Sequence, residues 1–357
     1  DRPGRHRIVS SRPFDGAYTG VVLRSKGAGG PFHFGGVNVS IRAFVDEHYR
    51  HFNAGTLGRA ARSLNGFLEN GGRIFLTLAG AMSTAEIGRT LADMIRAGHV
   101  SAISCTGANL EEDLFNLVAR NAYRSIPSPE DLSPADEAEL LDQRLNRVTD
   151  VCIPEDEAIR AIEHELMAVW SSAQAAEESL LPHLYLYRLL KSGALAGRFQ
   201  ANPDHSWLLA AAERDLPLYV PGWEDSTLGN IFAARCSQGI LSPSVVQSGT
   251  HYMTNLMAFY RSSSSPLAFL QSGGGIAGDF PICVVPLLHQ DLGERDVPLW
   301  SWFCQITDAN ASYGGYSGAP PNEKITWGKL GVETPKFNIQ SDASIVLPLM
   351  FGYVLDV

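Results

Sequence analysis

The sequence predicts an α/β protein of three layers, in which a mostly parallel sheet is covered by helices on both faces. Short apolar runs without polar alternation, such as residues 73–79 and 100–105, are typical of parallel strands that are buried on both faces. Amphipathic helical runs separate them, and residues 155–173 are the clearest example. We expect one domain over residues 31–357, preceded by an extended or mobile segment over residues 1–30 that is rich in Arg, Gly, Ser and Pro.

The expected elements alternate along the chain. Residues 39–70 read as helical, and two glycines end that helix. Ser83 and Glu86 have the spacing of a capping box, which would start the helix after the first strand. Residues 127–150 are polar and proline-bearing and are expected to form a surface excursion. Further strands are expected at residues 216–220, 266–270, 299–307 and 337–340, and further helices at residues 180–190 and 345–349.

Composition narrows the classes of function. The 357 residues are 45% hydrophobic and 18% charged, as in an ordinary globular protein, and the formal net charge is -10. That charge disfavours a nucleic-acid partner, which requires a basic surface. It would steer cationic ligands toward the protein, and it also serves solubility.

Cysteine usage and the length of the apolar runs predict the compartment. The five cysteines include no CxxC pair, and we expect them to be reduced and buried in a cytoplasmic protein. No apolar run approaches the length of a membrane span, and the first thirty residues lack the apolar core of a signal peptide. His48 and His51 have the spacing of two ligands on one helix face, but no third ligand supports them, so we expect no metal.

The chain is organised around residues 320–330, which hold two of its five lysines. Lys329 has apolar neighbours, and burial disfavours a charged ammonium, so that a neutral lysine can attack a carbonyl or imine carbon. Trp327 can hold a cationic amine over its ring, and Glu323 can supply a carboxylate. The alternative is a short surface helix whose lysine reaches solvent in the ordinary way.

The segment SGAPPNEKITWGK at residues 317–329 closely resembles the signature of deoxyhypusine synthases and of their relatives, the homospermidine synthases. The resemblance extends from about residue 44 to the C-terminus. It implies the family's NAD-binding fold and a homo-oligomer, a tetramer whose sites form between paired subunits. It also implies that Lys329 carries an aminobutyl group as a covalent imine, while Glu323 and Trp327 bind the polyamine.

The resemblance further implies a set of NAD contacts. The stretch TGANLEEDL at residues 106–114 matches a family stretch in which the first residues touch NAD and two glutamates lie near the nicotinamide ribose and the polyamine. The turn at residues 80–84 occupies another NAD-contacting turn, although its residue types differ. The cofactor residues implied in this way are Gly80, Ser83, Thr84, Thr106, Gly107, Ala108, Glu112, Asp225, Gly273, Gly274, Gly275, Thr307, Asp342 and Ala343.

An acid that follows a strand can bind ribose hydroxyls, which supports Asp342 on physical grounds. Plainer structural interpretations stand beside these roles. The acids of residues 111–113 suit a helix start, and Asp225 suits a turn or a helix cap.

The polyamine contacts implied by the resemblance are Glu111, Glu112, Asp279, Tyr316, Glu323 and Trp327, with Lys329 and Asp279 as catalytic residues. Three positions depart from the family pattern. Asp279 stands where a histidine is usual and could act as a base, Tyr316 replaces an aspartate of the eukaryotic enzymes, and Asn230 replaces a second acid.

Three functions remain open from the sequence. The first is NAD-dependent aminobutyl transfer from spermidine or putrescine to a small amine, as in homospermidine synthesis. The second is deoxyhypusine synthesis on a lysine of a translation initiation factor precursor, which the three departures weaken. The third is an NAD-binding homologue without transferase activity, against which the retained lysine motif argues.

Overall fold

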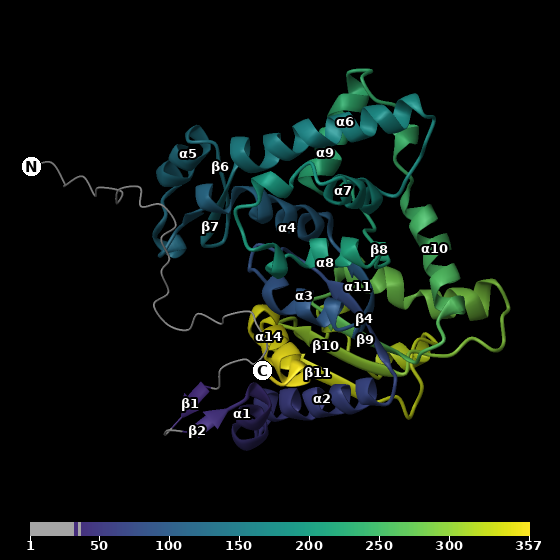
Figure 1. The fold of residues 1–357 in the computed structure, drawn as a ribbon. Helices are drawn as coiled ribbons and strands as arrows, with labels where there is room; N and C mark the ends of the chain where they lie inside the picture. The colour runs from purple at the N-terminus through teal and green to yellow at the C-terminus, as the bar shows by residue number, and fades with distance from the viewer. Residues whose placement is uncertain (1–31, 35–36) are drawn as a thin grey trace, which may run out of the picture.

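The computed structural model describes residues 32–34 and 37–357, so the segment expected to be extended or mobile, residues 1–30, lies outside the described residues. Its centre is a parallel six-stranded sheet with helices on both faces (Figure 1), which confirms the predicted fold class. In spatial order the strands are β11 (Lys336–Gln340), β10 (Trp302–Thr307), β9 (Leu267–Ser272), β3 (Arg73–Leu78), β4 (Val100–Cys105) and β8 (Leu218–Tyr219).

The strand order reverses once, and a reversal of this kind predicts where a ligand binds. The chain builds from β3 outward through β4 to β8, then returns to the other side of β3 with β9 and builds outward again through β10 to β11. In open α/β sheets, ligands bind outside the carboxyl ends of the strands at such a switch point. The ligand site expected at this switch point, called the crevice below, therefore lies between the loops that follow β3 and β9.

Helices cover the two faces of the sheet unequally. On one face α2 (Phe52–Glu69) and α14 (Ala343–Leu355) pack side by side near β10 and β11, and α3 (Gly88–Arg96) continues the layer (Figure 1). On the other face α11 (Gly275–Ile282) crosses β3, β4 and β9, with α10 (Gly249–Ser262) against it. The apolar strands are buried between these two layers, as their lack of alternation predicted.

Two stretches differ from expectation. The predicted helix over residues 39–70 is broken at residues 49–51 into α1 (Ile41–His48) and α2. The predicted surface excursion contains α5 (Pro134–Asp142) and β6 (Leu145–Val148), and β6 joins β7 (Val151–Pro154) and β5 (Arg124–Ser125) in a small antiparallel sheet. The other elements are β1 (Phe32–Phe34), β2 (Val37–Val39), α4 (Gly107–Ala119), α6 (Ala161–Ala175), α7 (Pro182–Lys191), α8 (Trp207–Glu213), α9 (Thr227–Ser237), α12 (Val284–Pro286) and α13 (Glu323–Thr326).

The predicted capping box at Ser83 and Glu86 is wrong, because α3 begins only at Gly88. The Ser83 hydroxyl instead donates to the Asn109 carbonyl and accepts the indole N–H of Trp207 at 2.9 Å. Glu86 has a left-handed backbone with φ of 55°, and its carboxylate forms ion pairs with arginines of neighbouring helices. Ser83 and Glu86 therefore bind partners distant in the sequence instead of each other's backbone.

The sheet face beneath α11 carries an aromatic row and, one pleat further along the strands, a polar row. Phe75, Phe269 and Phe303 are in register, and their rings stack at centroid distances of 5.9 and 6.0 Å. The polar row is fully buried and consists of Ser104, Thr77, Gln271 and Gln305, also in register across four strands. Buried glutamines need partners, and residues 316–324, described below, supply them.

Glu111 caps a neighbouring helix. Its carboxylate accepts the backbone N–H groups of Thr227 and Leu228, in the first turn of α9, at 2.8 and 2.7 Å. Burial is the largest cause that raises the pKa of Glu111, to about 7, although those two N–H groups oppose the shift. Gly107 packs just as closely on the cap of the same helix, since a Cβ there would lie 2.4 Å from the Ser226 Cβ.

Truncating the central ring of the aromatic row should destabilise the protein strongly. Phe269→Ala leaves a cavity between two stacked rings and is expected to lower the free energy of unfolding by about 3–5 kcal/mol in urea titrations. Tyr313→Ala removes an exposed ring and should change it by less than about 0.5 kcal/mol. Equal losses in the two variants would contradict the packing argument.

The free energy of unfolding should fall as the pH rises, because the pKa of Glu111 is raised in the folded protein. Its pKa is raised from 4.5 to about 7 in the native state, so its favourable contribution is complete below about pH 4.5 and is lost as the pH rises through 7. The unfolding free energy of Glu111→Gln, measured from pH 4 to 8, should lack this part of the decrease, which is worth roughly 3 kcal/mol at most. Glu130→Gln, which alters an exposed carboxylate, should keep the wild-type slope. A Glu111→Gln profile parallel to wild type would refute the assignment.

Candidate active site

Lys329 is placed by the turn that ends the short helix α13. The N–H of Lys329 donates to the Lys324 carbonyl at 3.1 Å, and the N–H of Gly328 donates to the Ile325 carbonyl at 3.0 Å. Together these bonds form a Schellman cap, which requires a left-handed residue, and Gly328 supplies it with φ of 67°. The Trp-Gly-Lys sequence is thus a helix stop that turns Lys329 back into the protein.

The Lys329 amine lies in an aromatic pocket with one carboxylate. The residue is only 5% exposed, and its Nζ lies 3.1 Å from Asp279 Oδ1. The same Nζ lies 5.5 Å from the centroid of the Trp327 ring and 5.6 Å from that of Tyr316, within the range of cation–π attraction. Trp327 itself is 61% exposed, so it offers a ring surface next to a buried amine. The structure therefore brings together Lys329, Asp279, Tyr316 and Trp327.

Lys324 is a member of this pocket that sequence reasoning missed. It is 2% exposed, and its Nζ donates to Gln305 Oε1 and to the Ala319 carbonyl, both at 3.2 Å. Its Nζ also lies 5.0 Å from the ring centroid of Tyr316. Burial, followed by the charge of Lys329, lowers the pKa of Lys324 to about 8. The signal available in the sequence was its spacing: Lys324 stands five residues before Lys329, and the turn that ends α13 lies between them.

Asp279 reaches Lys329 because α11 packs very closely on the sheet. A Cβ at Gly278 would lie 3.1 Å from the Tyr316 ring and 3.2 Å from the Gln271 side chain, so a larger residue would push these side chains away by a few tenths of an ångström. The hydroxyl of Tyr316 donates to Gln271 Oε1 at 2.9 Å, which satisfies one glutamine of the polar row. Asp279 is half exposed, and its Oδ1 also accepts a weak hydrogen bond from the thiol of Cys283 at 3.6 Å.

The glycines after β9 lie at the switch point of the sheet. Gly273 packs on Ala79 of the loop after β3, and a Cβ at Gly274 would lie 2.4 Å from the Ser317 Cβ. Gly275 and Gly80 both have positive φ, 59° and 62°, and no heavy atom lies within 4 Å of a Cβ built on either. These two glycines therefore leave room at the crevice in which a ligand could approach the backbone.

The loop after β3 is held by the first turn of α4. Thr106 caps that helix and donates its hydroxyl to the Gly80 carbonyl at 2.7 Å. Asn109, which sequence reasoning did not single out, donates to the same carbonyl at 2.8 Å and accepts the N–H of Ser83 at 2.9 Å. Because Ser83 is buried and bonded in this way, its role is to shape the loop, and the open backbone at Gly80 is the part that faces the crevice.

Glu112 and Thr84 form a second contact between α4 and this loop. The Thr84 hydroxyl donates to Glu112 Oε2 at 2.5 Å, and burial raises the pKa of Glu112 above its ordinary value. Glu111 points instead toward α9, where its two backbone bonds occupy the carboxylate. The two adjacent glutamates therefore differ in surroundings, and Glu112 is the one that borders the loop at the crevice.

The remaining predicted residues lie at strand or helix ends without bonding to the lysine. Thr307 ends β10 and accepts the N–H of Ala309 at 3.0 Å, while Ala108 is half-buried in α4. Asp342 is exposed and caps α14, beginning at Ala343, by accepting the N–H of Ser344 at 2.7 Å. Among the described residues, no hydrogen bond or ion pair connects Lys329 with Glu323 or Asp225, both of which are exposed.

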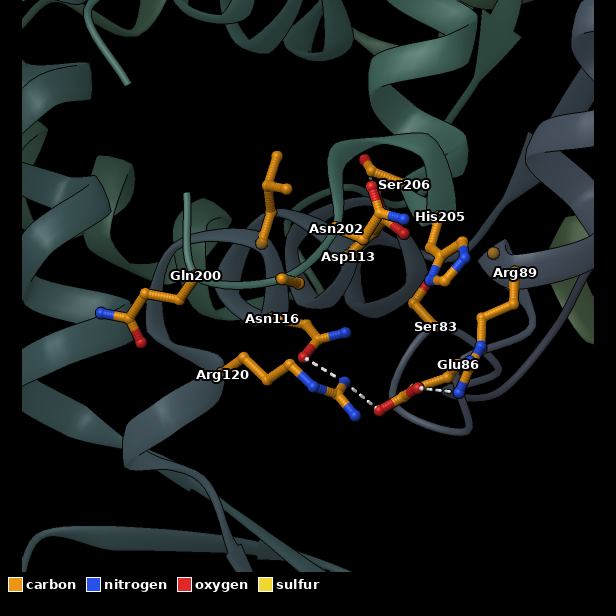
Figure 2. Close-up of a pocket in the computed structure, with 13 residues that line it drawn as sticks. Ser83, Glu86, Arg89, Asp113, Asn116, Arg120, Gln200, Asn202, His205 and Ser206 are labelled. Carbon is orange, nitrogen blue, oxygen red and sulfur yellow. Dashed lines mark hydrogen bonds and ion pairs between the residues drawn. The ribbon is translucent and has the colours of Figure 1, made fainter. Parts of the chain in front are cut away.

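A polar cavity of about 250 Å³ lies outside the lysine pocket, between the loop after β3 and the helices α3 and α4. Figure 2 shows Glu86 between Arg120 and Arg89, with His205 and Asn202 on the opposite wall. The cavity borders the predicted cofactor loop at Ser83, but none of its lining residues belongs to the pocket around Lys329.

Two wider searches concern the described part of the chain alone. Over residues 32–34 and 37–357, no group of three or more His, Cys, Asp or Glu side chains is arranged to hold a metal ion. Within the same ranges, none of the helices combines the length and the apolar character needed to span a bilayer.

Comparison with known proteins places the chain in a family. A deoxyhypusine synthase-like protein of Cyanothece sp. is 29% identical over 332 residues, covering 89% of this chain and 80% of the relative. One of Nostoc punctiforme is 29% identical over 327 residues with the same coverage of both chains. The crystal structure of a deoxyhypusine synthase candidate from Entamoeba histolytica has a TM-score of 0.54 at 12% identity, covering 89% of this chain and 94% of that one, and thus shares the fold.

The strongest of these findings is the match of a family model over most of the chain. The deoxyhypusine synthase model matches residues 46–354, which include every element of the six-stranded sheet, the switch point and the lysine pocket. The chain belongs to the deoxyhypusine synthase family.

Proposed function

We propose that this protein is an NAD-dependent transferase that moves an aminobutyl group from spermidine or putrescine to a small amine acceptor through an imine on Lys329. The observation that carries the proposal is the buried Lys329 amine, which is paired with Asp279 and lies beside the exposed ring of Trp327. A lysine in such a pocket has the surroundings of a Schiff-base nucleophile. Family membership supports the same reaction class.

Each residue of the pocket has a role that follows from its position and its exposure. Asp279 can take a proton from Lys329 or bind an incoming ammonium, since it contacts the amine and is half exposed. The Trp327 ring offers its face to a cationic polyamine, and the exposed carboxylate of Glu323 can attract a more distant ammonium. The burial of Lys329 excludes water that would hydrolyse an imine.

The covalent exchange needs no group beyond these side chains and the substrates. Once it has given up a proton, the Lys329 amine attacks the carbon of a substrate imine, the C–N bond to the departing amine breaks, and that amine leaves with a proton. A second amine then attacks the lysine imine and displaces Lys329 in the reverse sense. Asp279 is the carboxylate in contact with Lys329 for both proton movements.

The carboxyl edge of the sheet is where we place the dinucleotide. Gly80 and Gly275 leave open space at the switch point, and Asp342 follows the edge strand β11 as an exposed acid that can bind ribose hydroxyls. Glu112 lies on the other side of Gly80 from Asp342, in the helix after β4, where it accepts the hydroxyl of Thr84. Bound NAD would accept the hydride that creates the substrate imine and later return it.

A homo-oligomer, a tetramer in the family, remains part of the proposal, as does a cytoplasmic location. A lysine of a protein remains an alternative acceptor. The borohydride trapping experiment described in the next paragraph distinguishes the acceptors when putrescine and a lysine-bearing protein are supplied in turn.

Lys329→Ala should abolish transfer and leave NAD binding intact, because the amine that forms the imine is removed while the sheet edge is untouched. Borohydride reduction during incubation with NAD and spermidine or putrescine should trap an adduct of aminobutyl mass on Lys329 of the wild type, located by peptide mass spectrometry. Lys191→Ala, at a surface ion pair, should behave as wild type. Product formation by Lys329→Ala would remove the covalent role.

Gly275→Ala should weaken NAD binding by about tenfold or more in calorimetric titration, because a methyl group would enter the open space at the switch point. Alanine at a positive φ also costs about 1–2 kcal/mol of stability, so a matched control is needed. Gly239→Ala provides it, since Gly239 also has a positive φ and open surroundings but lies after α9. NAD affinity reduced equally in both variants would argue against the site.

A further inference from the structure

The polar cavity between α3, α4 and residues 200–206 has no part in the function proposed above. Its volume is about 250 Å³, and none of its lining residues belongs to the pocket around Lys329. Because a water molecule occupies about 30 Å³ in the liquid, the cavity has room for a small organic molecule. Close packing fixes its walls, since a Cβ at Gly88 would lie 2.5 Å from the carbonyl oxygen of His205.

The two carboxylates of the cavity are already bound by groups of the protein. Glu86 forms ion pairs with Arg120 and with Arg89 (Figure 2). Asp113 is buried, and its Oδ2 accepts the hydroxyl of Ser206 at 2.5 Å and a backbone N–H in the first turn of α8 at 3.1 Å. A cationic ligand would therefore have to compete with these partners for either acid.

Hydrogen-bond donors, in contrast, are left over in the cavity. The amide oxygen of Asn202 accepts the N–H of Asp204 at 3.0 Å, and the amide oxygen of Asn116 accepts from Arg120 at 3.4 Å. These two bonds fix which end of each amide is the oxygen and leave its NH₂ group as a donor. Within residues 32–34 and 37–357, neither NH₂ group donates a hydrogen bond to the protein.

Arg89 adds an accessible positive charge to these donors. Its side chain is 57% exposed, and its ion pair with Glu86 spans 3.5 Å, which is longer than an ordinary hydrogen bond. Arg120 binds the same carboxylate more closely, so that two guanidinium groups share one acid. On the opposite wall, burial and then the charge of Arg89 lower the pKa of His205, so its ring is neutral at pH 7 and offers one N–H.

We propose that this cavity is a binding site for a small anion that bears a carboxylate or a phosphate group. Oxygens of the anion accept hydrogen bonds from the guanidinium of Arg89 and from the NH₂ groups of Asn116 and Asn202, which are the donors that the fold leaves over. A hydrogen bond from a charged donor is stronger than one between neutral groups, and a planar guanidinium can bind two oxygens at once. The site is separate from Lys329, and binding there requires neither NAD nor an amine.

Calorimetric titration of the full chain tests this site. Inorganic phosphate and succinate are titrated separately at constant ionic strength, because salt screens an exposed charge. We expect at least one of the two anions to bind. Arg89→Ala removes the charge, whereas Asn202→Asp keeps the oxygen that accepts from Asp204 and replaces the NH₂ donor by a second oxygen. Each change should weaken binding about tenfold or more.

Two variants serve as matched controls. Arg59→Ala and Asn255→Asp make the same chemical changes at exposed positions that do not line the cavity, so both should keep the wild-type affinity for the anion. If Asn202→Asp does not fold, judged by circular dichroism, Arg89→Ala decides by itself, because that exposed side chain forms no hydrogen bond within the part of the chain that the structure describes.

Binding of phosphate alone, or of succinate alone, would support the site and identify the group that it takes. The proposal is overturned if neither anion binds to the wild type, or if Arg89→Ala and Asn202→Asp bind as the wild type does. Equal weakening in the control variants would also overturn it, since the anion would then respond to the overall charge of the protein and not to this cavity.

Discussion

Burial of two lysine amines in an aromatic interior is the constraint on which the structure around the site depends. Charged groups removed from water must be paired or hydrogen-bonded, and this pocket meets the requirement with one carboxylate, one glutamine and one backbone carbonyl. The glutamine belongs to a polar row that crosses the sheet in register, next to a row of stacked phenylalanines. Strand register, rather than any local motif, thus fixes where a buried cation can lie.

The glycines after β9 connect this pocket to the switch point. Gly274 packs against Ser317, which precedes the lysine segment, and α11 begins at Gly275 and carries Asp279 to Lys329. A change in the backbone at Gly274 or Gly275 would consequently move the carboxylate that pairs with Lys329. Close packing at Gly274, where a Cβ would lie 2.4 Å from the Ser317 Cβ, therefore links the proposed cofactor crevice to the lysine pocket.

The first turn of α4 organises the other wall of the crevice. Thr106 and Asn109 bind the carbonyl of Gly80, and Glu112 binds Thr84, so the loop after β3 keeps its shape through buried hydrogen bonds. Glu86 lies at the far end of this loop in a left-handed conformation, held by two ion pairs. Such a conformation persists only where surrounding contacts over-determine it, and the two ion pairs are such contacts, so they help to fix the shape of the loop after β3.

The sequence by itself determined the fold class, the strands and the lysine motif, because unbroken apolar runs, helical periodicity and a specific thirteen-residue signature are local properties of the chain. It did not predict that Glu111 caps α9, that Ser83 and Glu86 leave the capping box, or that Lys324 shares the pocket of Lys329. These outcomes depend on partners far away in the chain. Only the tertiary structure decided them, because a polar side chain binds whichever donor or acceptor packing brings nearest, and local spacing carries no information about that partner.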